Sequence, residues 1–125
     1  MNNTEARPHL GLVQAGIILL TLATAIIHLY FVFFDEAMTQ KFVIMFILNS
    51  LGYVGMLAAL YLPISFLASL RPIARFLLIL QAAASIAAYI YVGVFSTLGW
   101  VTKGIEVLLI LLLLIEAGMS KRPRQ

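Results

Sequence analysis

The sequence predicts an all-α integral membrane protein, with four transmembrane helices in an up-down antiparallel bundle. Of its 125 residues, 63% are hydrophobic and only 10% are charged, whereas a soluble domain carries roughly 25% charged residues. The apolar residues also fall in four long runs with short connections between them. So few charges could not cover a water-facing surface, so we expect the lipid bilayer to surround most of the chain.

Each apolar run is long enough to cross a membrane. Roughly 20 residues span a hydrocarbon core of ~30 Å, and a helix satisfies the backbone hydrogen bonds that lipid cannot. The expected spans cover about 10–34, 42–62, 73–95 and 101–118. They form a single transmembrane domain over 10–118, between an N-terminal segment, 1–9, and a basic tail, 119–125.

The three connections are short, which makes consecutive helices antiparallel neighbours. The middle connection, 63–72, has Pro63 and Pro72 at its two ends, and proline interrupts a helix. In the last connection, 96–100, Gly99 is expected to adopt the backbone angles of a tight turn.

The Lys and Arg residues predict the orientation of the chain. An arrangement with both termini on the cytoplasmic side of the cell membrane follows the positive-inside rule. That side then holds Arg7, Arg71, Arg75, Lys121, Arg122 and Arg124, and the opposite side holds only Lys41 and Lys103.

Polar side chains inside membrane spans are rare and usually face the interior of the bundle. At 100° per residue, Gln14, Thr21, Thr24 and His28 fall within roughly 80° on the first span. Such stripes are typical of faces through which helices pack and share hydrogen bonds. The second span has Asn49 and Tyr53 on one face, and the third has Gln81, Ser85 and Tyr89.

The fourth span has Lys103 and Glu106 near its start and then a long run without polar atoms. We therefore expect it to be the span most exposed to lipid. Glu116, near its inner end, is expected to extend to the membrane surface and pair with Lys121 and Arg122.

Counting residues from the outer ends of the spans predicts a polar site. At ~1.5 Å per residue, His28, Asn49, Tyr89 and Glu106 lie roughly 8 to 10 Å below the outer boundary. Glu106 is the natural partner of His28, and Lys103 can neutralise the same carboxylate. Two interpretations remain open: a fixed network that joins the first and fourth helices, or a site for a proton, ion or ligand.

Several kinds of chemistry are disfavoured by the residues that the chain has. Without cysteine there are no disulfides or thiolate metal sites. His9 and His28 stand at opposite ends of one helix, so one chain cannot supply both axial ligands of a haem. No complete catalytic set, metal-ligand set or nucleotide-binding motif is present, so we expect neither an enzyme nor a resident metal or cofactor.

These observations favour a non-enzymatic membrane protein that serves as an accessory or subunit of a larger membrane assembly. Its expected partners are the lipid bilayer and another protein or a second copy of the chain, and not nucleic acid. One alternative is a dimeric transporter or channel for a proton or small solute, using His28 and Glu106. Another is a redox accessory that binds a quinone or a haem.

Overall fold

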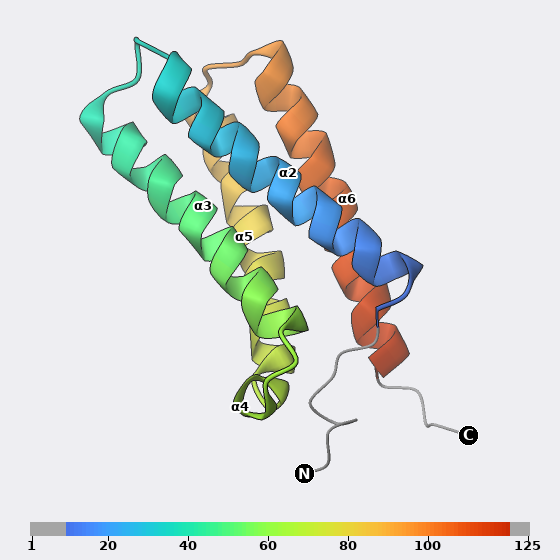
Figure 1. Cartoon of the computed structure of the whole chain (residues 1–125). Coiled ribbons are helices and arrows are strands. Elements are labelled where there is room, and N and C mark those ends of the chain that lie inside the picture. Colours follow the sequence, from blue (N-terminus) through green and yellow to red (C-terminus); the bar gives the residue numbers. More distant parts are fainter. Residues whose placement is uncertain (1–9, 121–125) are drawn as a thin grey trace.

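The structure, a computed structural model, describes residues 10–120 (Figure 1). These residues are all-helical, and four of the helices are long and apolar enough to cross a membrane, as the sequence predicts. The predicted segment 1–9, with His9, and the tail from residue 121 lie outside the described residues. The helices are α2 (Leu12–Phe34), α3 (Gln40–Tyr61), the short α4 (Ser65–Ala68), α5 (Arg71–Val92) and α6 (Thr97–Ser120).

The four long helices surround a common interior. Both α2 and α5 pack against α3 and α6, so that α3 and α6 lie across the bundle from each other (Figure 1). The α2–α3 and α5–α6 connections lie together at one end of the bundle, which we call the loop end (Figure 1). The opposite end carries α4 and is called the α4 end.

The two largest differences from the predicted spans are the end of α5 and the start of α6, and each has a local cause. Helix α5 ends at Val92 because Gly93 adopts the left-handed conformation, with φ of 77°, which glycine tolerates best. Helix α6 already begins at Thr97, because the Ser96 hydroxyl accepts a hydrogen bond of 3.0 Å from the Gly99 amide, as an N-cap residue does. The predicted tight turn at Gly99 is therefore wrong, since Gly99 lies inside α6.

The middle connection is also shorter than predicted. Pro72 lies in the first turn of α5 instead of preceding the helix. Proline is tolerated there because the first amides of a helix have no partner within it. The connection therefore consists of 62–70, with α4 inside it.

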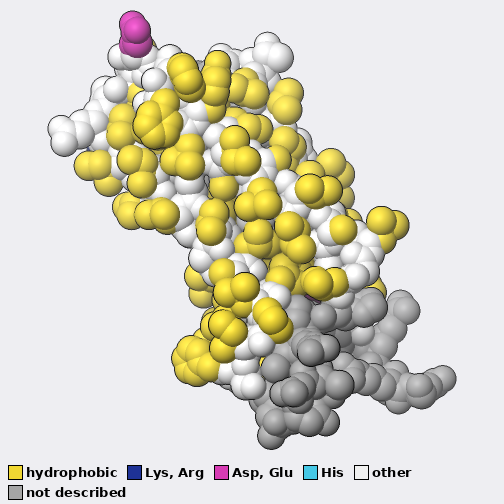
Figure 2. All heavy atoms as spheres, viewed as in Figure 1, with side chains coloured by type: hydrophobic (Ala, Val, Ile, Leu, Met, Phe, Trp, Pro, Cys, Tyr) yellow, Lys and Arg dark blue, Asp and Glu magenta, His cyan; other side chains and the backbone are white. Residues whose placement is uncertain are grey.

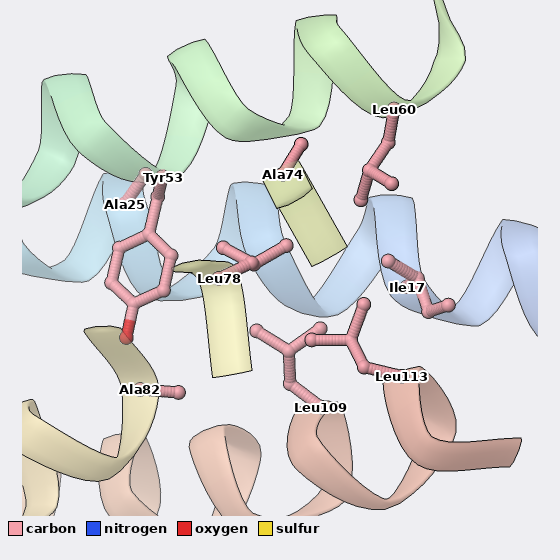
Figure 3. Close-up of a cluster of buried hydrophobic side chains, with 9 residues drawn as sticks. All are labelled: Ile17, Ala25, Tyr53, Leu60, Ala74, Leu78, Ala82, Leu109 and Leu113. Atoms are coloured by element: carbon pink, nitrogen blue, oxygen red, sulfur yellow. The ribbon is translucent and has the colours of Figure 1, made fainter. Parts of the chain in front are cut away.

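Apolar side chains from all four long helices meet in the interior (Figure 3). Leu78, Leu109 and Leu113 are fully buried at its centre, and the Tyr53 hydroxyl points away from α3 into the bundle (Figure 3). Outside, many large apolar side chains are exposed on every long helix. Figure 2 shows hydrophobic side chains spread over the described part of one face, with an acidic side chain at the loop end.

The prediction that the fourth span is the most exposed to lipid is wrong for α6. A larger share of α6 is buried than of any other long helix, and α5 is the least buried. The reason is that the buried positions of α6 recur at helical spacing through the leucine-rich run. They include Thr102, Lys103, Glu106, Leu109, Leu113 and Glu116.

Candidate functional site

The polar stripe of α2 faces the interior of the bundle, as predicted. Gln14, Thr21, Thr24 and His28 are all buried. His28 is held by its own helix, because its Nδ1 donates a hydrogen bond of 2.7 Å to the Thr24 carbonyl. This bond places the ring proton on Nδ1 and turns Nε2 away from the helix backbone. The His28 ring lies edge-on to Phe46, with 5.1 Å between the ring centroids, and 6.2 Å from the Tyr53 ring.

The fully buried Glu106 carboxylate lies at the centre of a polar cluster made by three helices. Its Oε1 accepts a hydrogen bond of 2.5 Å from the Lys103 ammonium, three residues earlier on α6. Its Oε2 accepts a hydrogen bond from the Tyr53 hydroxyl of α3. Lys103 also donates to the Ser85 hydroxyl of α5, at 2.8 Å. We call Tyr53, Ser85, Lys103 and Glu106 the Glu106 cluster.

An aromatic group separates the Glu106 cluster from the loop end. The Lys103 ammonium lies 5.4 Å from the centroid of the Tyr89 ring, within the range of a cation–π contact. The Tyr89 hydroxyl accepts a bond of 3.0 Å from the Ser96 amide and donates one of 3.2 Å to the Ser96 carbonyl. Phe95 and Trp100 each lie within about 5 Å of the Tyr89 ring, centroid to centroid.

The structure brings three of the five predicted site residues together: Lys103, Glu106 and Tyr89. His28 lies next to Tyr53, but its hydrogen bond goes to Thr24, so the expected direct partner of Glu106 is replaced by Tyr53. Asn49 belongs to a separate contact, in which its side-chain oxygen accepts a bond of 2.8 Å from the Gln81 amide.

Tyr53 and Ser85 belong to the Glu106 cluster but are not among the site residues predicted by counting residues from the outer ends of the spans. Both stand on polar helix faces that are predicted to point into the interior. Tyr53 starts deeper in α3 than Glu106 does in α6, and its long side chain makes up the difference. Tyr53 could have been predicted as a partner of Glu106, because a tyrosine on the inward face of one helix can donate a hydrogen bond to a carboxylate on the inward face of another.

A second buried carboxylate, Glu116, lies toward the α4 end. It accepts hydrogen bonds from all three other long helices: 3.0 Å from Gln14 of α2, 2.6 Å from Tyr61 of α3 and 2.8 Å from Arg75 of α5. We call these residues the Glu116 cluster. Glu116 is only 5% exposed, so the expected extension to the membrane surface is wrong, and Lys121 and Arg122 lie outside the described residues.

The two clusters share one design. In each, a buried glutamate of α6 receives one cation and one tyrosine hydroxyl, and the tyrosine comes from α3 on the far side of the bundle. Buried charges are stable only when they are paired and their remaining hydrogen bonds are satisfied. Within residues 10–120, no group of three or more His, Asp or Glu side chains is arranged to hold a metal ion.

The fold and its clusters define a class: a helical protein with four helices of membrane-spanning length and paired charges in its interior. No protein-family model, curated protein or solved structure matches the chain.

Proposed function

We propose that the chain is a small, non-enzymatic, multi-pass protein of the cell membrane that serves as a subunit or accessory of a larger membrane assembly. The observation that carries the proposal is that each of the buried carboxylates, Glu106 and Glu116, pairs with a cation and accepts a hydrogen bond from a tyrosine. Charges compensated in this way hold helices in place, and neither Glu106 nor Glu116 is left free to act as a general base. The interior is thus suited to a fixed scaffold.

The outer faces support the same proposal. Large apolar side chains such as Leu48, Phe76 and Leu108 are exposed on three different helices. In a bilayer these faces contact lipid, and they can equally pack against the helices of another membrane protein. A rigid four-helix unit with such a surface is typical of a small subunit.

The proposed arrangement is an up-down antiparallel bundle with both termini in the cytoplasm. The α4 end then faces the cytoplasm with Arg71 and Arg75, and the loop end faces outward with Asp35, Glu36 and Lys41. This distribution agrees with the positive-inside rule. In this arrangement the exposed Trp100 at the loop end would lie near the outer membrane interface, where amphipathic rings are favoured.

Purification of the tagged full chain from membranes in a mild detergent tests the proposal. We expect a complex that contains a second membrane protein at fixed stoichiometry through affinity and size-exclusion steps, identified by mass spectrometry. An unrelated four-span protein with the same tag is the control. Recovery of the chain alone, as a monomer or dimer, would contradict membership in an assembly.

A dimeric transporter of a proton or a small solute is the second candidate function. It is favoured by the ionisable side chains around Glu106, since buried ionisable groups within membrane spans often mark transport pathways. The His28 ring lies next to this cluster, 6.2 Å from the Tyr53 ring. Reconstitution of the purified chain in liposomes tests this candidate: a flux that Glu106→Gln abolishes would support it, and impermeable liposomes would contradict it.

A further inference from the structure

The surroundings of the Lys103 ammonium form a complete receptor for a primary ammonium ion. Two of its N–H groups are directed to acceptors, the Glu106 carboxylate at 2.5 Å and the Ser85 hydroxyl at 2.8 Å. The centroid of the Tyr89 ring lies 5.4 Å from the ammonium. A carboxylate, a hydroxyl and an aromatic face are the groups that bind an alkylammonium ion, because they match its charge and its three N–H donors.

This receptor is built largely without Lys103. The Tyr53 hydroxyl holds the second oxygen of Glu106 from α3, and Ser85 and Tyr89 come from α5. The Tyr89 hydroxyl is in turn tied to the Ser96 backbone. Glu106 and Tyr89 therefore have contacts besides Lys103, whereas the ammonium itself is carried on a flexible four-carbon chain.

The Lys103 side chain can also extend toward the loop end. Lys103 lies six residues into α6, so its Cα is about 9 Å along the helix from Thr97 at the loop end. A lysine at that depth can extend its side chain to the membrane interface, where water solvates the ammonium. The ring of Tyr89 faces the ammonium, and its hydroxyl accepts a hydrogen bond from Ser96 at the loop end.

We propose that the Glu106 cluster binds a small primary alkylammonium ion that enters from the loop end and replaces the Lys103 ammonium. In this exchange one monovalent cation takes the place of another, so the buried Glu106 carboxylate remains neutralised throughout. Lys103 moves to the interface and acts as an internal competitor for the site. This inference rests on the geometry of the cluster and is independent of membership in an assembly.

Trp100 provides the probe for a direct test. It is the only tryptophan in the chain, and its ring lies 5.2 Å from that of Tyr89. The purified full chain in detergent micelles is titrated with n-propylammonium chloride at constant ionic strength, and tryptophan emission is recorded. Tetramethylammonium chloride is the matched control ion, because it carries the same charge without an N–H donor.

We expect a saturable change in emission with propylammonium and none with tetramethylammonium. Lys103→Ala removes the competitor and should tighten propylammonium binding at least tenfold. Lys41→Ala, which removes an exposed lysine, should leave the affinity unchanged. Glu106→Gln should abolish the saturable change, and Ser85→Ala should weaken binding about tenfold.

Three results overturn the proposal: a wild-type chain that does not respond, an equal response to both ions, or an unchanged affinity in Glu106→Gln and Ser85→Ala. If Lys103→Ala does not fold in micelles, propylammonium present during extraction should restore the folded protein and tetramethylammonium should not. Failure of that rescue also counts against the site. Each of these results leaves the proposed membership in an assembly untouched, since that is judged by co-purification.

Discussion

The Tyr53 hydroxyl of α3 donates a hydrogen bond to the Glu106 carboxylate of α6, across the full width of the bundle. Tyr61 and Glu116 repeat the same relationship between the same two helices, two turns further along α3. Because α3 and α6 face each other across the interior, these bonds join helices whose backbones are not neighbours (Figure 1). Both diagonal contacts therefore hold the bundle closed as well as satisfying a buried charge.

The diagonal contact at Glu106 predicts the effect of removing one hydroxyl. Tyr53→Phe keeps the buried ring but leaves Glu106 Oε2 without its donor, which should lower the free energy of unfolding by about 1–3 kcal/mol. Thermal unfolding in detergent measures the loss. Tyr91→Phe, at a position that is 91% exposed, is the matched control and should change little. Equal stability of the two variants would show that the Tyr53 hydroxyl contributes nothing.

A glycine contact predicts how the aromatic group at the loop end responds to added volume. A Cβ at Gly99 would lie 2.5 to 2.8 Å from the hydroxyl and ring atoms of Tyr89. Gly99→Ala should therefore displace the ring and shift the emission of its neighbour Trp100. Gly104→Ala on the same helix meets open space and should leave the emission unchanged. An unshifted spectrum in Gly99→Ala would mean that Tyr89 does not rest against α6 there.

The Glu116 cluster predicts which of two substitutions lowers the free energy of unfolding more. Arg75→Met removes the cation and leaves a buried carboxylate uncompensated, which should cost about 3–5 kcal/mol. Gln14→Leu removes one neutral donor and should cost only about 0.6–2 kcal/mol. Reversible unfolding in mixed micelles measures both free energies. The opposite order would indicate that the charge of Glu116 is balanced by a group other than Arg75.

The proposed topology predicts which ends of the bundle react with an impermeant reagent. The chain has no cysteine, so single cysteines can be introduced without removing any. In intact cells, Glu36→Cys at the exposed α2–α3 connection should react with an impermeant maleimide added outside. Ser69→Cys near α4 should react only after the membrane is permeabilised. The reverse pattern would place the termini outside.

Composition and length were enough to predict the four helices, because membrane-spanning runs are set by the number of consecutive apolar residues. The ends of α5 and α6 were harder to predict. Gly93 and Ser96 end one helix and begin the next within four residues, and both lie in or beside an apolar run that the count of hydrophobic residues extends to residue 95. The start of α6 is set by the Ser96 hydroxyl, which caps the helix, and a hydropathy count does not detect helix caps.

The candidate site was predicted in part. Lys103 and Glu106 belong to one helix, so their spacing predicts their contact directly. The partners on other helices depend on rotation and on side-chain length, which a count of depth leaves out. The long Tyr53 side chain reaches Glu106 from a deeper level, while Asn49, at the expected depth, turns to Gln81 instead. Glu116 was misassigned because its partners Gln14, Tyr61 and Arg75 come from three separate spans.

The central claim is that Lys103 and Glu106 form one compensated unit in the interior. A double-mutant cycle with Lys103→Met, Glu106→Gln and the combined variant tests it through free energies of unfolding in detergent. We expect each single substitution to cost about 3–5 kcal/mol, because each strands the other charge, and the double variant to cost clearly less than their sum. Strict additivity of the two costs would contradict the pairing.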